Sequence, residues 1–213
     1  MRLFKLLFLG LSFFAAQIMA QTTSASSLKL SVYSVMVSTS PFCTSPVTIF
    51  DNAAPTLLDF ITKPTLGSSG SPTNPPDGTY NCVIIKMSDN IVFTPVAAAG
   101  ASCAAGTQYT TDVCTNTSSM TVPNSGVTTA CTGTGTVPSA DIVYMYLTTN
   151  ANASTGSNAF LQPANIASTN GIKIANPLVV SGNASSKFIV NTANKVGTGG
   201  GACGINAPVF DFQ

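Results

Sequence analysis

Alternating apolar and polar residues predict a chain built mainly from β-strands. The clearest alternation covers residues 28–38, and a second strand-like run, residues 79–87, is dense in β-branched and aromatic residues. Pro75, Pro76 and Gly78 precede the second run and are typical of a turn. Because this run is apolar on both faces, we expect it to be a central strand.

Strict alternation also predicts which side chains share a face. In residues 28–38, one face receives Leu28, Leu30, Val32 and Met36, and the other receives Tyr33, Val35 and Val37. In residues 79–87, one face receives Tyr80, Cys82 and Ile84, and the other receives Val83, Ile85 and Met87.

Tight turns are predicted to connect several strands as hairpins. Residues 88–90 should fold residues 91–93 back against residues 79–87, with Pro95 ending the second strand. A similar hairpin is expected between residues 177–180 and 187–190. Other predicted strands cover residues 47–50, 109–114, 141–148, 171–174 and 209–212, whereas residues 55–61 suit a strand or one helical turn and residues 160–166 one helical turn.

Three segments lack this patterning. Residues 21–27 are predicted to be a flexible arm, and residues 197–201 a flexible glycine run. Residues 115–138 form a Ser/Thr/Gly-rich insertion, which suits either an exposed linker or flat polar strands.

The first twenty residues have the pattern of a secretory signal peptide. Arg2 and Lys5 precede an apolar run, and a small-residue cleavage site ends at Ala20. Residues 21–213, or 213 − 20 = 193 residues, are then expected to form a single β-sandwich domain. No cysteine precedes Cys43, so we expect no lipid anchor.

Charge is scarce in the mature chain. Removing Arg2 and Lys5 from eight basic residues leaves 8 − 2 = 6 lysines against seven aspartates, with no arginine, histidine, glutamate or tryptophan. A near-neutral chain argues against a nucleic-acid partner and against electrostatic attachment to anionic lipid. A surface poor in charge is also less protected against self-association.

Six cysteines in an exported chain predict three disulfides. Sequence alone permits fifteen pairings, of which we favour Cys43 with Cys82, Cys103 with Cys114, and Cys131 with Cys203. A zinc site is the competing interpretation, but the chain has no histidine and no close Cys-x-x-Cys pair. We therefore expect no metal and no other cofactor.

The order of several short motifs resembles a known family. Val32-Tyr33-x-Val35-x-Val37 is followed by Leu57-Leu58-Asp59-Phe60 and then by Pro76-Asp77-Gly78-Thr79-Tyr80. Over residues 28–95 the chain resembles a β-sandwich domain of bacterial surface proteins, of the transthyretin-like (carboxypeptidase-regulatory-like) kind, and is similar to multi-copy Cys-containing secreted proteins of predatory Gram-negative bacteria. The resemblance implies a binding or structural module and supplies no catalytic residues.

The residue types argue against an enzyme. Without histidine there is no Ser-His-Asp or Cys-His arrangement. Lys86 as a nucleophile and Asp77-Gly78-Thr79 as an aspartic-protease motif are weaker alternatives. Oxygen-bearing side chains at Asp51, Asn52, Asp89 and Asn90 suit calcium, although turn formation explains them equally well. The sequons at Asn116, Asn152 and Asn183 would matter only in a eukaryotic secretory route.

These patterns predict an all-β, antiparallel β-sandwich with three disulfides that is exported to the periplasm, the outer membrane surface or the extracellular space. The first functional hypothesis is a non-enzymatic structural protein of the cell envelope that forms homo-oligomers and associates with itself or with a lipid membrane. The alternative is an adhesion or ligand-recognition module that binds a glycan or protein on another cell.

Overall fold

The computed structural model is all-β and contains three disulfides, as the sequence predicts. It describes residues 21–62, 71–72, 75–134, 140–154, 156, 158–182, 184–199 and 201–213. The predicted signal peptide lies outside this part of the chain. Within it there is no helix, so residues 160–166 do not form the predicted helical turn.

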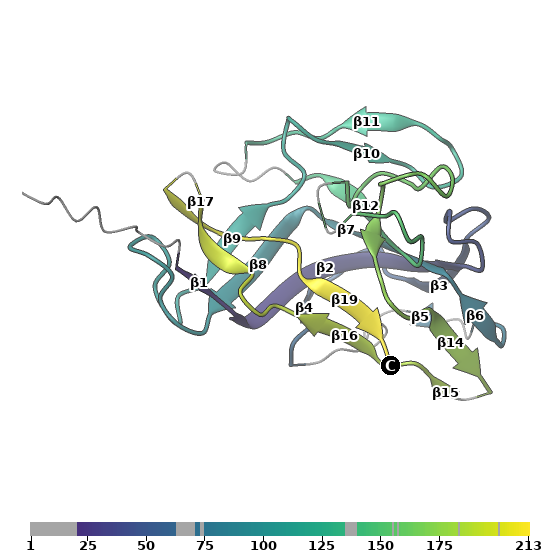
Figure 1. Cartoon of the computed structure of the whole chain (residues 1–213), viewed down its shortest axis with the longest axis horizontal. Helices are drawn as coiled ribbons and strands as arrows, with labels where there is room; N and C mark the ends of the chain where they lie inside the picture. Colours follow the sequence, from purple (N-terminus) through teal and green to yellow (C-terminus); the bar gives the residue numbers. More distant parts are fainter. Residues whose placement is uncertain are drawn as a thin grey trace, which may run out of the picture.

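The longest strand, β2 (Ala25–Ser38), is paired along both of its edges (Figure 1). β3 (Val47–Asp51) and β4 (Leu57–Asp59) follow one edge in succession, and β7 (Cys82–Ser88) and β8 (Asn90–Pro95) follow the other. Lys29 pairs with Asp59 on one side and with Val92 on the other. All four partners run antiparallel to β2, so β2 is the common strand of the large sheet.

The predicted hairpin at residues 88–90 is wrong. β7 and β8 both pair with β2, and together they form one nearly continuous line interrupted at Asp89. The backbone N–H of Asp89 donates to the carbonyl of Asp141 at 3.1 Å, and its carbonyl accepts from the N–H of Val113 at 3.1 Å. These two bonds satisfy the backbone in an extended conformation, and the chain does not fold back.

A third line of strands lies beyond β7 and β8. β9 (Tyr109–Asp112) pairs with β8, and β12 (Ile142–Thr148) pairs with β7, both antiparallel. At the two margins of the sheet, β13 (Ile172–Lys173) runs parallel to β12, and β5 (Ser71–Pro72) pairs with β3. The segment between β9 and β12 therefore leaves the sheet and returns beside Asp89.

Smaller sheets form a second layer over one face of the large sheet. They comprise β6 (Gly78–Tyr80) with β14 (Leu178–Ser181) and β15 (Ala184–Ser185), β16 (Phe188–Asn191) with β19 (Val209–Phe212), and β1 (Thr22–Thr23) with β17 (Val196–Gly199) and β18 (Ala202–Ile205). Phe188 packs against Phe60, Phe210 and Phe212 at ring-centroid distances of 6.0, 5.8 and 5.3 Å. This aromatic cluster joins the two layers.

Several predicted local pairings are wrong for the same physical reason. Residues 188–191 pair with the C-terminal strand and not with residues 177–180, which pair with β6 and β15. Parts of the expected flexible arm and glycine run, residues 21–27 and 197–201, form strands. The observed pairings satisfy backbone N–H and C=O groups that an unpaired arm or glycine run would leave to water.

A bulge in β2 overturns the predicted faces. The register against β7 shifts between Val32 and Ser34, and Val32 and Val35 then belong to the same buried cluster. An inserted residue reverses the alternation beyond it. The second run is also interrupted, between β6 and β7, so Tyr80 lies in the cluster of Val83 and not with Cys82.

The polar insertion forms strands, as one of the two predicted alternatives requires. β10 (Ser119–Thr121) and β11 (Thr128–Ala130) make a two-stranded hairpin above the large sheet in Figure 1. Thr121 anchors it, because its N–H donates to the carbonyl of Phe160 at 2.9 Å and its carbonyl accepts from the hydroxyl of Tyr146 at 2.6 Å. Residues 135–138 lie outside the described residues.

The disulfides are Cys43–Cys82, Cys103–Cys203 and Cys114–Cys131, with Cα–Cα distances of 5.3, 4.8 and 5.4 Å. The first confirms our prediction, and the other two correct it. Cys114 and Cys131 meet because the insertion turns back on itself, and Cys203 approaches Cys103 because the C-terminal strands fold over the sheet. Neither approach is visible in sequence spacing.

Asp59 fastens β4 to the start of β2. Burial raises the pKa of its carboxyl, but hydrogen bonds outweigh this effect and hold the pKa below its usual value. The donors are the hydroxyl of Ser27 at 2.7 Å and the backbone N–H groups of Ile61, Leu28 and Thr62 at 3.0, 3.3 and 3.4 Å.

The lowered pKa of Asp59 predicts a loss of stability in acid. The unfolded carboxyl, with a usual pKa of about 3.9, takes up its proton at higher pH than the folded one. The contribution is thus complete above that pH and disappears as pH falls through the folded-state pKa. Denaturation between pH 6 and pH 2 should show a shallower decline for Asp59→Asn than for the wild type, and an unchanged decline for the exposed Asp51→Asn. Identical declines in all three would contradict this role of Asp59.

The disulfide pairing predicts a specific digest. Cleavage on the amino side of aspartate, without reduction, should release residues 89–111 linked to residues 141–210, and residues up to 50 linked to residues 77–88. Residues 112–140 should appear as a single peptide with an internal bond. Mass spectrometry that instead finds residues 89–111, 112–140 and 141–210 joined in one species would support the pairing that we correct here.

Candidate functional site

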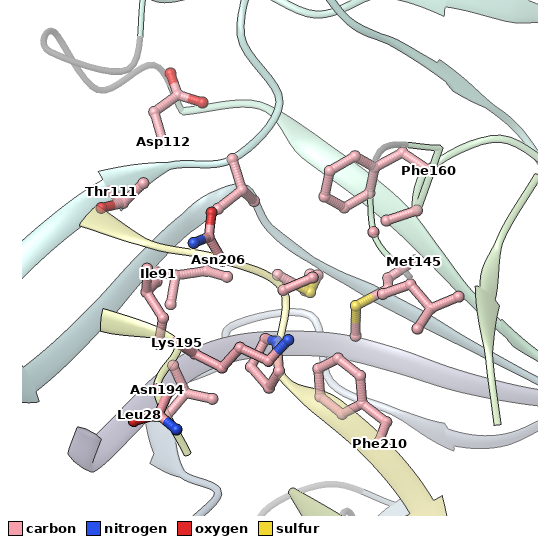
Figure 2. Close-up of a pocket in the computed structure, with 18 residues that line it drawn as sticks. Leu28, Ile91, Thr111, Asp112, Met145, Phe160, Asn194, Lys195, Asn206 and Phe210 are labelled. Atoms are coloured by element: carbon pink, nitrogen blue, oxygen red, sulfur yellow. The ribbon is translucent and has the colours of Figure 1, made fainter. Parts of the chain in front are cut away.

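A pocket of about 600 Å³ lies between the large sheet and the C-terminal segment that covers it (Figure 2). Its walls come from β2, β7, β8, β9, β12 and β13, from Gly156, Ala159 and Phe160, and from residues 194–195, 205–208 and 210. Segments that are distant in the sequence thus enclose one space. A volume of this size is typical of sites for small molecules.

The inner part of the pocket is apolar. Met87 on β7 and Met145 on β12 are buried, and Phe160 and Phe210 flank them. Met145 pairs with Ile85, two residues before Met87, so the two thioethers come from adjacent strands and the same buried cluster. Methionine side chains are flexible and polarisable, so this surface can adapt to apolar groups of different shapes.

The outer side of the pocket is polar and comes from the C-terminal half of the chain. Asn194 adopts a φ of 57°, in the left-handed region that asparagine tolerates, and turns the chain between β16 and β17. The backbone of Lys195 is held on both sides, because its N–H donates to the carbonyl of Thr192 at 3.0 Å and its carbonyl accepts from the N–H of Asn206 at 2.8 Å. Lys195 and Asn206 are thereby fixed beside each other.

Asp112 and Thr111 line the opposite side of the pocket. Asp112 is buried, and its carboxylate accepts the backbone N–H of Cys114 at 3.1 Å. In Figure 2 this carboxylate points away from Met145 and Phe210. The acidic group therefore stabilises the start of the insertion and does not face the apolar part of the pocket.

Close backbone packing closes one wall. Gly156 has a φ of 146°, and a Cβ atom built on it would lie 2.5 Å from the Cβ of Ala207. Only glycine suits this conformation and this contact. The loop around Gly156 and the segment after β18 can therefore approach closely enough to enclose the pocket.

The residues singled out from the sequence do not gather in one place. All six cysteines are in disulfides. Lys86 is partly buried, with its ammonium 5.9 Å from the ring centroid of Tyr144. Asp77 accepts the N–H of Gly182 at 2.9 Å, which gives its turn a structural role.

The proposed calcium ligands are separated. Asp51 lies on β3 and Asp89 follows β7, on opposite edges of β2. No group of three or more acidic, cysteine or histidine side chains within the described residues is arranged to hold a metal ion. Of the sequons, Asn116 and Asn152 are exposed, and Asn183 lies outside the described residues.

The hydroxyl of Tyr146 lies in the buried part of the large sheet. Burial, with a smaller contribution from Tyr144, raises its pKa above the usual value, and the hydroxyl donates to the carbonyl of Thr121. It therefore stays protonated and serves as an anchor for the insertion.

The pocket has no counterpart among the sites predicted from the sequence. Met87 was expected on a buried strand face, but nothing in the sequence placed Lys195, Asn206 or Phe210 opposite it. These residues meet it only through the folding of the C-terminal strands over the sheet. A lysine that follows an asparagine in a turn has no distinctive pattern that could have revealed the site.

Comparison with known proteins gives no match among family models, curated proteins or solved structures. The resemblance to transthyretin-like surface domains therefore stays a prediction. No helix in the described part of the chain is long and apolar enough to span a membrane. Three disulfides are typical of a protein in an oxidising, non-cytoplasmic compartment.

Proposed function

We propose that the protein is an exported, non-enzymatic recognition module that binds a small, largely apolar ligand in the pocket between its two layers. The observation that carries this proposal is the combination of an apolar interior around Met87 and Met145 with a polar side at Lys195 and Asn206. Binding sites for small molecules commonly have this composition, in which apolar area provides affinity and a few polar groups fix orientation.

The composition supports binding over catalysis. The chain has no histidine, and the pocket side chains named above include neither a thiol nor a paired acid and base. The proposal keeps the recognition role of the alternative hypothesis but replaces the glycan with an apolar ligand. Sugar rings need many hydrogen-bond partners, whereas methionine and phenylalanine side chains form much of this pocket's interior. We place the protein at the cell envelope or outside the cell.

Filling the pocket should weaken the binding of an apolar probe. The neutral dye N-phenylnaphthylamine should bind the wild type saturably, at one site per chain, with increased fluorescence. Ile91→Trp adds an indole to a residue that lines the pocket and should weaken binding about tenfold, or by about 1.4 kcal/mol. Val96→Trp is the matched control, because Val96 is exposed just beyond β8.

Thermal unfolding must first show that both variants fold. Undiminished dye binding in correctly folded Ile91→Trp would contradict the assignment of the pocket.

Self-assembly is a second candidate function, favoured by apolar side chains exposed on one edge of the sheet. Val47 on β3 and Leu57 on β4 are 52% and 50% exposed, and within the described residues β5 pairs with β3 at Phe50 and Asp51. Exposed apolar residues on an edge strand favour pairing with another copy of the chain.

Self-assembly predicts a defined oligomer in size-exclusion chromatography with light scattering, run with and without detergent or liposomes. Lysines at both Val47 and Leu57 should convert it to a monomer, whereas Val127→Lys, on the exposed insertion, should not. A wild-type monomer that is indifferent to lipid would contradict this second candidate.

A further inference from the structure

We infer that the ligand of this pocket is an anionic amphiphile of the fatty-carboxylate class, with its carboxylate at Lys195 and its hydrocarbon chain against Met87 and Met145. The inference rests on the proposed function and adds to it the chemical class and the orientation of the ligand.

The charge of the pocket supports an anionic head group. Lys195 is the one cationic residue among those that line the pocket within the described part of the chain. In Figure 2 its side chain extends across the pocket toward Phe210, and its terminal nitrogen lies at the end nearest Met145. No salt bridge between Lys195 and another described residue is present in the structure. An incoming carboxylate would therefore gain a charge-assisted hydrogen bond without displacing an internal acid.

The opposing acid does not compete for this role. The carboxylate of Asp112 is buried, is directed away from the apolar interior and accepts the N–H of Cys114. A cationic ligand would have to take this carboxylate from the backbone of the insertion. Asn194 and Asn206 flank Lys195 on the polar side, and their amides suit hydrogen bonding to carboxylate oxygens.

The apolar interior supports an aliphatic chain. Met87, Met145, Phe160 and Phe210 are buried and line the same pocket as Lys195. Flexible thioethers fit a chain that has many rotamers better than they fit one rigid ring system. Each added methylene should therefore increase affinity roughly fourfold until the pocket is full, because burying one methylene contributes about 0.8 kcal/mol.

Calorimetric titration with decanoate and with decanol separates the head group from the chain. The wild type should bind decanoate about tenfold more tightly than decanol, and affinity should fall along the series decanoate, octanoate, hexanoate. Lys195→Gln should lose the preference for decanoate and keep its affinity for decanol. Lys195→Arg should retain the preference. The exposed Lys187→Gln, with an equal change in net charge, should behave as the wild type.

The outcomes test the inferred head group and the proposed binding site separately. Equal wild-type affinities for decanoate and decanol, or a decanoate preference that persists in Lys195→Gln, would overturn the anionic head group and leave an apolar binding site in place. No binding of decanoate, decanol or the neutral dye would overturn both the inference and the proposed function. A loss of preference in Lys187→Gln would show that net charge, and not Lys195, is responsible.

Discussion

The double-sided pairing of β2 is the constraint on which the rest of the structure depends. A strand of 14 residues is long enough to hold β3 and β4 along one edge and β7 and β8 along the other. The bulge between Val32 and Ser34 then determines which side chains face the second layer. Without it, strict alternation would direct Met36 into the main core in place of Val35.

This arrangement also explains how the pocket forms. β12 and β9 pair with the outer edges of β7 and β8. The insertion between β9 and β12 leaves the sheet and returns to it at the backbone of Asp89, so the long insertion does not interrupt the sheet. β7 and β12 consequently present Met87 and Met145 to the second layer. The C-terminal segment crosses above them, held by the Cys103–Cys203 disulfide and by the aromatic cluster around Phe188, and it brings Lys195 to the open side.

Sequence patterns predicted the positions of the strands more successfully than the pairing of strands and cysteines. The strands at residues 28–38, 141–148 and 209–212 were predicted because apolar alternation reports local burial. The hairpin at residues 88–90 and two of the disulfide pairs were wrong, since those predictions assumed that neighbours in sequence are neighbours in space. In this molecule Asp89 bonds to Val113 and Asp141, and Cys103 meets Cys203. The same long-range pairing assembles the pocket, so the opposition of Lys195 to Met87 could not be predicted.

The most direct test of this account is a crystal structure of the protein with decanoate that carries bromine at its terminal carbon. We expect one strong anomalous peak inside the pocket, at the end of the chain remote from the Lys195 ammonium group, with the carboxylate within hydrogen-bonding distance of that group. A reversed ligand, with bromine at Lys195, would contradict the inferred orientation. An empty pocket under saturating decanoate would contradict the central claim that this space between the two layers is a binding site.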